Sequence, residues 1–300
     1  MIRVFIIGFI ALLLGCSTAT DKKEIAKSSL QKKITGGYDF NDSQQYNLTS
    51  SLREISGLSY ADNKLYANND EEGKVFVLDA VSGKTINTIA FSAKGDYEGV
   101  EMLHNALAVV KSNGDILFYD VKKEKTSIVK TKLKTENDVE GLCFYAKKNQ
   151  LLLACKGKVL KGDAKNKEKA IYSYDIEEEK LNKNPFLTVK DKEVKECVEK
   201  LYKDEAISKK KFKRLVSRAV DFSPSGIAIH PKTKNYYIIS AKGSTLMVFD
   251  KNKDLKDVVF LSEKALPQPE GICFDDKANL YISTESKGSV GRLYKYVYKH

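Results

Sequence analysis

Four glutamates recur at or near one position of a repeated sequence pattern, each followed within three positions by a glycine. They are Glu54, Glu98, Glu140 and Glu270, and Ser225 takes the corresponding place in a fifth copy. Carboxylates that face one another at close range raise each other's pKa, which favours shared protons, a cationic ligand or a bound metal. The pattern therefore predicts an acidic ring that attracts a cation.

The side-chain chemistry points to calcium. An all-oxygen set suits a hard cation, and Ca²⁺ takes about six to eight oxygen ligands. The repeated position holds neither histidine nor cysteine, so zinc is not indicated. Asn69, Asp70 and Ser225 are candidates for additional oxygens. The alternative is that the glutamates accept hydrogen bonds from backbone amides of neighbouring repeats and bind no metal.

The repeat itself predicts the elements that position these residues. Each copy contains three short segments rich in β-branched and aromatic residues, followed by a weaker fourth. Gly57, Gly99 and Gly141 lie 42 residues apart, and Gly226 lies 45 residues before Gly271. Four strands in about 42 residues are typical of a β-propeller blade, whose innermost strands line a central channel. The fold class is therefore all-β, a single propeller.

The weaker outer strands are expected over residues 85–91, 126–133, 185–189 and 258–261. Residues 38–48 precede the first blade. We expect them to supply the outer strand of the last blade, which would close the ring and remove an open sheet edge.

The interval between Gly141 and Gly226 is 85 residues, twice the usual spacing. It contains two apolar patterns with helical periodicity, one beginning at Val194 and one at Phe212. We therefore favour five blades with a helical insertion over residues 190–218, and six blades are the alternative. Such an insertion would serve as a lid over one channel mouth or as a docking surface.

The N-terminus resembles a bacterial lipoprotein signal. One basic residue precedes a short apolar run, and Leu13-Leu14-Gly15-Cys16 has the order of a lipobox. We predict a signal peptide over residues 1–15, a lipid-anchored flexible tether over 16–34 and a propeller domain over 35–300. Acylation of Cys16 would attach the protein to a membrane of the cell envelope, and Ser17 favours the outer membrane. The alternative is a short uncleaved anchor.

The chain is basic, with a formal net charge of +11. The densest positive stretch runs over residues 190–218. One interpretation is that it attracts anionic lipid, polyanions or phosphorylated ligands. We favour the other, that it is the solvated face of a lysine-rich protein. Export and the lack of a recognisable module argue against nucleic-acid binding. Cys143 and Cys273 take equivalent places in two repeats, which predicts small buried residues rather than disulfide partners.

The repeat segments resemble the SdiA-regulated family, bacterial propellers related to NHL-type repeats. The most specific segments are Pro269-Glu270-Gly271 and Ser225-Gly226-Ile227-Ala228-Ile229-His230-Pro231. The resemblance implies a propeller in the cell envelope, often with calcium. Asp96-Tyr97-Glu98-Gly99 is also distantly similar to calcium-dependent β-propeller phytases, although no matching cluster of Lys and Arg phosphate ligands is evident beside the glutamates.

Two function classes follow. We favour a non-enzymatic module that binds a protein, a glycan or a small molecule, with Ca²⁺ as a structural ion. The alternative is a calcium-dependent hydrolase of phosphate esters or lactones that uses the central channel. No catalytic residue is assigned, because neither His104 nor His230 has a serine or cysteine partner by pattern.

Overall fold

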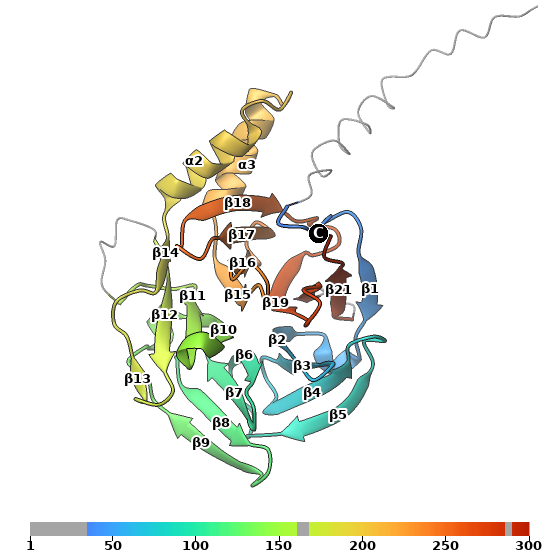
Figure 1. Cartoon of the computed structure of the whole chain (residues 1–300), viewed down its shortest axis with the longest axis vertical. Coiled ribbons are helices and arrows are strands. Elements are labelled where there is room, and N and C mark those ends of the chain that lie inside the picture. The colour runs from blue at the N-terminus through green and yellow to red at the C-terminus, as the bar shows by residue number, and fades with distance from the viewer. Residues whose placement is uncertain (1–34, 161–167, 286–289, 300) are drawn as a thin grey trace, which may run out of the picture.

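A ring of five antiparallel sheets surrounds a central channel in the computed structural model, which describes residues 35–160, 168–285 and 290–299 (Figure 1). Each sheet is a blade whose strands follow one another in sequence from the channel outward. The prediction of a five-bladed propeller is confirmed, and the six-bladed alternative is wrong. The predicted signal peptide and tether, Cys16 included, lie outside the described residues.

The strands of each blade agree with the repeat. Blade 1 consists of β2 (Ile55–Ala61), β3 (Lys64–Asn69), β4 (Lys74–Asp79) and β5 (Thr85–Ala90). Blade 2 consists of β6 (Tyr97–Met102), β7 (Ala106–Lys111), β8 (Ile116–Asp120) and β9 (Lys125–Val129). Blade 4 consists of β15 (Pro224–Ile229), β16 (Tyr236–Ser240), β17 (Thr245–Phe249) and β18 (Leu255–Phe260). Single 3-10 turns, η1 (Ser50–Leu52), η2 (Thr135–Asn137) and η3 (Ala146–Lys148), lie between strands.

Blade 3 differs at its outer edge. It consists of β10 (Val139–Tyr145), β11 (Gln150–Cys155) and β12 (Lys169–Asp175), and two short strands share the far side of β12. These are β13 (Lys180–Leu181) and β14 (Leu187–Val189), which pair with opposite ends of β12. The predicted strand over residues 185–189 is therefore shorter than expected, since Pro185 has no N–H with which to extend it.

Blade 5 closes the ring with a strand from the other end of the chain. Its inner strands are β19 (Gln268–Phe274), β20 (Leu280–Glu285) and β21 (Arg292–Tyr296), and β1 (Gln44–Asn47) pairs antiparallel with β21. The predicted closure is thus confirmed. It covers an edge that would otherwise present unpaired backbone groups.

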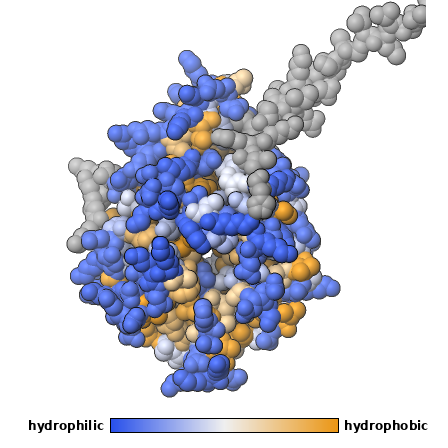
Figure 2. All heavy atoms as spheres, viewed as in Figure 1, coloured by the Kyte–Doolittle hydropathy of each residue, from blue (hydrophilic) through white to orange (hydrophobic). Residues whose placement is uncertain are grey.

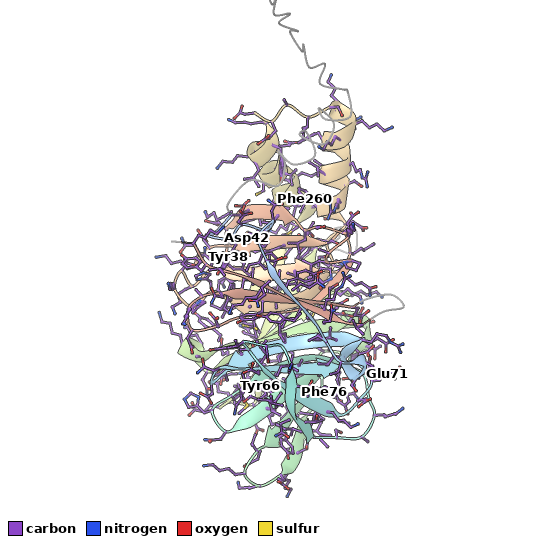
Figure 3. All side chains as sticks on the ribbon, turned by 90° about the vertical axis from the view of Figure 1, so that its right-hand side faces the viewer. Tyr38, Asp42, Tyr66, Glu71, Phe76 and Phe260 are labelled. Carbon is purple, nitrogen blue, oxygen red and sulfur yellow. The ribbon has the colours of Figure 1, made fainter. Side chains whose placement is uncertain are left out.

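The insertion forms a helical hairpin of α2 (Asp191–Tyr202) and α3 (Lys209–Val220). Val194, Val198 and Ala219 are buried against the apolar residues of blade 4. The hairpin stands out from the rim of the propeller beside β18, with Phe260 near its base (Figures 1 and 3). It does not cover a channel mouth, so the expectation of a lid is wrong. No helix among the described residues has the length and apolar character needed to cross a bilayer.

The remaining core lies between adjacent blades, where side chains of neighbouring sheets interlock. Hydrophilic residues cover most of the face seen in Figure 2. Cys143, Cys155 and Cys273 are buried and free, as predicted for Cys143 and Cys273.

Candidate functional site at an acidic channel mouth

A β-bulge in each innermost strand creates the ring around the channel. The pairing register shifts just before or at the repeat glycine in all five blades, for example between Tyr97 and Gly99. A bulge leaves one residue unpaired and re-aims its side chain. The residues at the bulge that line the channel are Ser56, Glu98, Glu140, Ser225 and Glu270. The ring therefore holds three glutamates and two serines.

The glycines allow the five strands to approach so closely. A Cβ atom at Gly57 would lie 2.7 Å from the backbone nitrogen of Val100 and 2.8 Å from the Cα atom of Gly99. Because both neighbours are backbone atoms of the next blade, they cannot move aside as a side chain can. Glycine at this position thus sets the width of the channel.

Glu54 is not in the ring, which corrects the predicted set of four glutamates. The bulge in blade 1 falls between Ile55 and Gly57, so Ser56 occupies the ring position. Glu54 lies two residues before it, a place held by Asp96 and Asp138 in blades 2 and 3. These three carboxylates form a second, outer set that the sequence analysis did not recognise, although the Asp-x-Glu-Gly spacing was visible.

A third set lies at the inner end of the second strand. Asp70 and Lys156 come directly after β3 and β11, and the pairing register puts Glu285, the last residue of β20, at the equivalent place in blade 5. Asp70 was predicted at the mouth, and Lys156 and Glu285 were missed. Comparing the ends of all five second strands would have found them.

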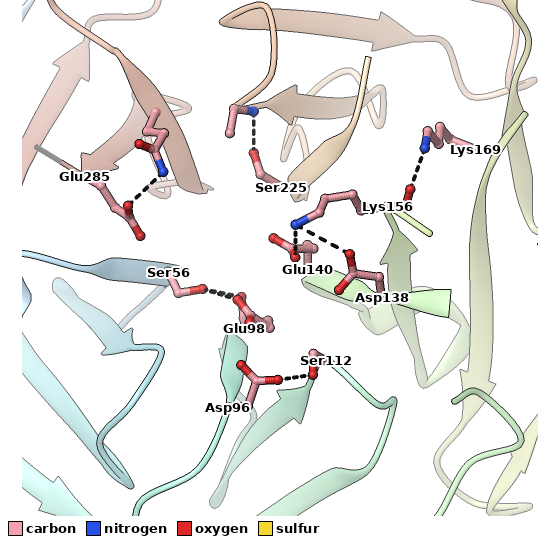
Figure 4. A network of polar contacts seen from close by, with 12 residues as sticks. Ser56, Asp96, Glu98, Ser112, Asp138, Glu140, Lys156, Lys169, Ser225 and Glu285 are labelled. Atoms are coloured by element: carbon pink, nitrogen blue, oxygen red, sulfur yellow. Dashed lines mark hydrogen bonds and ion pairs between the residues drawn. The ribbon is translucent and has the colours of Figure 1, made fainter. Parts of the chain in front are cut away.

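Lys156 is the cation that this acidic group contacts. Its Nζ atom lies 2.5 Å from Oε1 of Glu140 and 3.5 Å from Oδ2 of Asp138 (Figure 4). Lys169 donates to the backbone carbonyl of Lys156 and so fixes its backbone. Burial lowers the pKa of Lys156, but the hydrogen bond and charge of Glu140 outweigh it and raise the pKa overall. Lys156 therefore stays charged and neutralises one ring carboxylate.

The other two ring glutamates have no such partner in the described residues. Burial, with the charge of Glu140 second, raises the pKa of Glu98 to about 8, although Ser56 Oγ donates to its Oε2 at 2.9 Å. Burial also raises the pKa of Glu270 well above its usual range, and the charges of Glu140, Glu285 and Glu98 add to the shift. Glu98 therefore holds its proton near neutral pH unless a cation compensates it, and burial likewise disfavours the ionised form of Glu270.

Asp70, Glu285 and Glu54 form a second concentration of negative charge at the mouth. Burial and the charge of Glu54 raise the pKa of Asp70. Burial and the charge of Asp70 raise the pKa of Glu285 to about 7. Gln268 Nε2 donates to Glu285 Oε2 at 2.9 Å, whereas Asp70 Oδ1 is buried and has no hydrogen-bond partner among the described residues. A buried oxygen of this kind is a position where a cation or a water would be favourable.

Two predicted ligands already have partners. Asn69 donates through Nδ2 to the Ser51 carbonyl, and its Oδ1 accepts from the Glu72 N–H at 2.7 Å. Ser225 Oγ donates to the Pro269 carbonyl at 2.6 Å and accepts from the Ala241 N–H at 3.0 Å. These contacts tie neighbouring strands together, so both residues contribute to the walls of the mouth.

The mouth offers the donor atoms that a hard metal ion prefers, but its carboxylates are too far apart to surround one ion directly. The donors are carboxylate oxygens, as a hard cation requires. In the described part of the chain, no three His, Cys, Asp or Glu side chains converge to hold one ion directly. The free space at the level of the ring is about 10 Å³, which is close to the room one water molecule needs. An ion at the mouth would thus be held in part through water, which Ca²⁺ accepts readily.

The opposite mouth also carries acidic side chains, Glu101, Asp275 and Asp276, which the sequence did not indicate as a site. Glu101 lies two residues beyond the repeat glycine, and its Oε2 accepts from Ser59 Oγ at 2.7 Å. Burial raises its pKa to about 7, although bonds from Ser59 and the Phe144 backbone oppose the shift. Cys143 and Cys273 line the same hollow of about 170 Å³. This mouth carries less charge, so the first is the candidate site.

The fold and the mouth together define a five-bladed β-propeller with an acidic channel entrance. The SdiA-regulated family model matches residues 164–287, from blade 3 through the helical hairpin and blade 4 into blade 5. Over that segment the match agrees with the resemblance to this family seen in the sequence. No curated protein matches the sequence.

Solved structures with a similar fold include several enzymes. Glutaminyl cyclase from Myxococcus xanthus is 10% identical, with 84% of this chain and 93% of that chain covered and a TM-score of 0.53. The gluconolactonase XC5397 from Xanthomonas campestris is 14% identical, with 85% and 80% covered and a TM-score of 0.49. A luciferin-regenerating enzyme is 13% identical, with 81% and 77% covered and a TM-score of 0.46. At these identities the likeness to the cyclase establishes the fold alone, and the other two carry no further argument.

Proposed function

We propose that this chain is a cell-envelope propeller that binds Ca²⁺ at its acidic mouth and uses the loaded mouth to hold a protein, glycan or small-molecule ligand. The observation that carries the proposal is the excess of desolvated carboxylates over cations. Burial raises the pKa of five of these side chains, Asp70, Glu98, Glu140, Glu270 and Glu285. The more exposed Glu54, Asp96 and Asp138 precede the ring in blades 1, 2 and 3. Lys156 contacts both Glu140 and Asp138. Asp70, Glu98, Glu270 and Glu285 form no ion pair with another described residue, so they are the carboxylates that would bind a divalent ion.

The unpartnered oxygen of Asp70 marks the place where the ion would bind. Asp70 and Glu285 would hold it, with Glu54 beside them, and Glu98 and Glu270 would supply further oxygens directly or through water. The bound ion supplies positive charge, which would neutralise the carboxylates and attract an anionic oxygen of a ligand. The narrow ring leaves no room for an organic molecule, so a ligand would be held above it at the mouth.

Binding is favoured over hydrolysis by the contacts of the hydroxyl groups at the ring. Ser56 donates to Glu98 and Ser225 donates to a backbone carbonyl. Within the described residues, neither serine is hydrogen-bonded to a histidine that would activate it as a nucleophile. His230 uses Nδ1 to accept from the Lys232 and Thr233 N–H groups at 3.1 Å, away from the ring.

Attachment through an acylated Cys16 completes the proposal. The supporting feature is the order of basic residue, apolar run and Leu-Leu-Gly-Cys at the N-terminus. We propose the outer membrane as the site of attachment, on the basis of Ser17. The mass of the N-terminal peptide from membranes of the expressing cell tests this part separately. An unmodified Cys16 would refute the anchor without affecting the calcium proposal.

The direct test is calorimetric titration of residues 35–300 with Ca²⁺ and Mg²⁺ after dialysis against EDTA, together with thermal unfolding. This fragment contains every described strand and helix. We expect Ca²⁺ to raise the melting temperature more than Mg²⁺, since a ligand at about 100 times its Kd adds about 2.7 kcal/mol to the free energy of unfolding.

A matched pair of variants separates the mouth from general charge effects. Asp70→Asn with Glu285→Gln removes the two carboxylates that would hold the ion, and Glu177→Gln with Glu178→Gln removes two exposed ones from the turn after β12. Calcium binding should be lost in the first variant and kept in the second. An equal response of both variants, or no heat and no stabilisation in the wild type, would refute the proposal.

A further inference from the structure

The outward face of α3 carries an unbroken set of positive charges. The helix contains six Lys and Arg residues and no Asp or Glu. Its exposed residues are Lys209, Lys210, Lys213, Arg214 and Ser217. None of these four cations has an ion-pair partner within the described residues. Figure 2 shows hydrophilic side chains over most of the visible hairpin surface.

The neighbouring helix shows what an ordinary solvated face looks like in this protein. Helix α2 carries three Lys and four Asp or Glu residues in alternation. Lys190 Nζ lies 3.2 Å from Glu193 Oε1, and Lys192 Nζ lies 3.9 Å from Glu196 Oε1. The two helices pack together as one hairpin, yet only α3 lacks acidic residues. A high lysine content of the whole insertion therefore does not explain the charge of α3. The exposed side of α3 therefore carries positive charge that no acidic side chain of the described residues neutralises.

This face is held in a fixed orientation. Arg218, on the inward side of α3, donates to the carbonyls of Gly243, Ser244 and Leu261 in blade 4, the latter two at 3.0 and 2.7 Å. Its Nε atom lies 3.2 Å from Glu263 Oε1. Ala219 is buried against the same blade. The exposed cations of α3 are therefore presented outward by a helix that cannot rotate freely.

The face also lies where the described chain begins. Thr35 lines the same hollow as Tyr202, Arg214 and Phe260. The predicted lipid-bearing Cys16 precedes Thr35 by a segment of 18 residues, 17–34. A segment of that length spans at most about 65 Å. The proposed anchor would join the described domain beside α3, which would place α3 on the side of the domain that faces the membrane.

We infer that the basic face of α3, formed by Lys209, Lys210, Lys213 and Arg214, binds the anionic phospholipid headgroups of the membrane in which the protein is anchored. Such headgroups attract Lys and Arg side chains that lie within a Debye length of the surface. The hairpin stands out from the rim of the propeller and away from the central channel, so it can meet a surface without entering the channel (Figures 1 and 3).

This inference uses the proposed anchor only for the orientation of the domain, and its test does not involve the anchor. Residues 35–300, which lack Cys16, are floated with two kinds of vesicle, one of phosphatidylcholine alone and one of phosphatidylcholine mixed with anionic phosphatidylglycerol. We expect binding only to the anionic vesicles. Binding should disappear in about 1 M salt, where the Debye length is about 3 Å.

Two triple variants of equal charge change locate the contact. Lys209→Gln, Lys210→Gln and Lys213→Gln remove three cations from α3, and Lys192→Gln, Lys195→Gln and Lys200→Gln remove three from α2. The α3 variant should bind about a hundredfold more weakly, since each cation near an anionic surface contributes about 1 kcal/mol. The α2 variant should bind within about threefold of the wild type. Circular dichroism verifies that both remain folded.

Three results would overturn the inference. The wild type would show no preference for anionic vesicles, or the α3 variant would bind as tightly as the wild type, or the α2 variant would lose as much binding as the α3 variant. Retention on heparin without binding to anionic vesicles would assign the face to a soluble polyanion and would equally refute it. The state of Cys16 does not alter any of these readings.

Discussion

The Nζ atom of Lys156 lies 2.5 Å from Oε1 of Glu140, so a cation from the end of β11 neutralises a carboxylate that a bulge in β10 turns into the channel. The glutamate side chain is 12% exposed and the lysine 42%. This pair separates Glu140 from Glu98 and Glu270, which depend on protons or on an added ion. The mouth is therefore electrostatically uneven, with its compensated side at blade 3.

Replacement of Lys156 by Met should destabilise the propeller and strengthen calcium binding. Without the lysine, Glu140 is left buried and unpaired, which costs about 2 kcal/mol of the free energy of unfolding. The loss in the free energy of unfolding should be larger at pH 8 than at pH 5. Burial raises the pKa of Glu140 in the folded protein, so its ionisation at higher pH destabilises the folded state relative to the unfolded one. Urea unfolding at both pH values and calcium titration measure the two effects.

The double variant with Glu140→Gln provides the control for this prediction. Removing the charge of Glu140 should restore part of the stability that Lys156→Met loses, because the unpaired carboxylate is the source of the penalty. If the losses of the two single variants simply added in the double variant, the ion pair between Lys156 and Glu140 would not contribute to stability.

Gly57→Ala should destabilise the protein by about 2–3 kcal/mol. The added Cβ would lie 2.7 Å from the Val100 nitrogen, and relief requires the strands of blades 1 and 2 to separate. Chemical denaturation of the variant measures the loss. A change below about 0.5 kcal/mol would mean that the ring of strands is wider than described and that glycine is not required there.

The sequence predicted the blades and their closure because these depend on local periodicity and on a repeat of about 42 residues. It placed Glu98, Glu140 and Glu270 correctly in the ring for the same reason. It misplaced Glu54, because the bulge in blade 1 puts Ser56 at the ring position and leaves Glu54 two residues earlier, in the place of Asp96 and Asp138. Lys156 was missed because it meets Glu140 only once β10 and β11 are paired, and the sequence does not show the register of that pairing.

Arg218→Met should loosen the helical hairpin without unfolding the blades. The substitution keeps most of the apolar stem but removes donors to the Ser244 and Leu261 carbonyls. Loss of these charge-assisted bonds is expected to cost about 2–4 kcal/mol locally. Hydrogen exchange should accelerate in α3 and remain unchanged in β10. Arg214→Met on the exposed face is the control, and comparable exchange in both variants would contradict a fixing role for Arg218.

His230→Asn should alter the dependence of stability on pH. His230 is buried beside Phe274 and Tyr298, with ring centroids at 5.0 and 5.1 Å. Burial, followed by the charges of Lys232 and Lys234, lowers its pKa to about 4. The unfolded histidine, with a pKa near 6.5, takes up a proton first as the pH falls, so the free energy of unfolding decreases between about pH 6.5 and pH 4.

Asparagine does not titrate in this range, and its Oδ1 atom can accept from the Lys232 and Thr233 N–H groups in place of the imidazole Nδ1. The variant should be less stable than the wild type at pH 7.5, because it loses the aromatic contacts. The difference should shrink by about 2 kcal/mol at pH 4.5, less than the full shift implies, since the two lysine charges are exposed and screened. Denaturant midpoints across this range measure the effect, with His104→Asn on the surface as the control. Parallel stability curves for the wild type and His230→Asn would show that His230 takes up its proton without unfolding and that the aromatic cluster admits water.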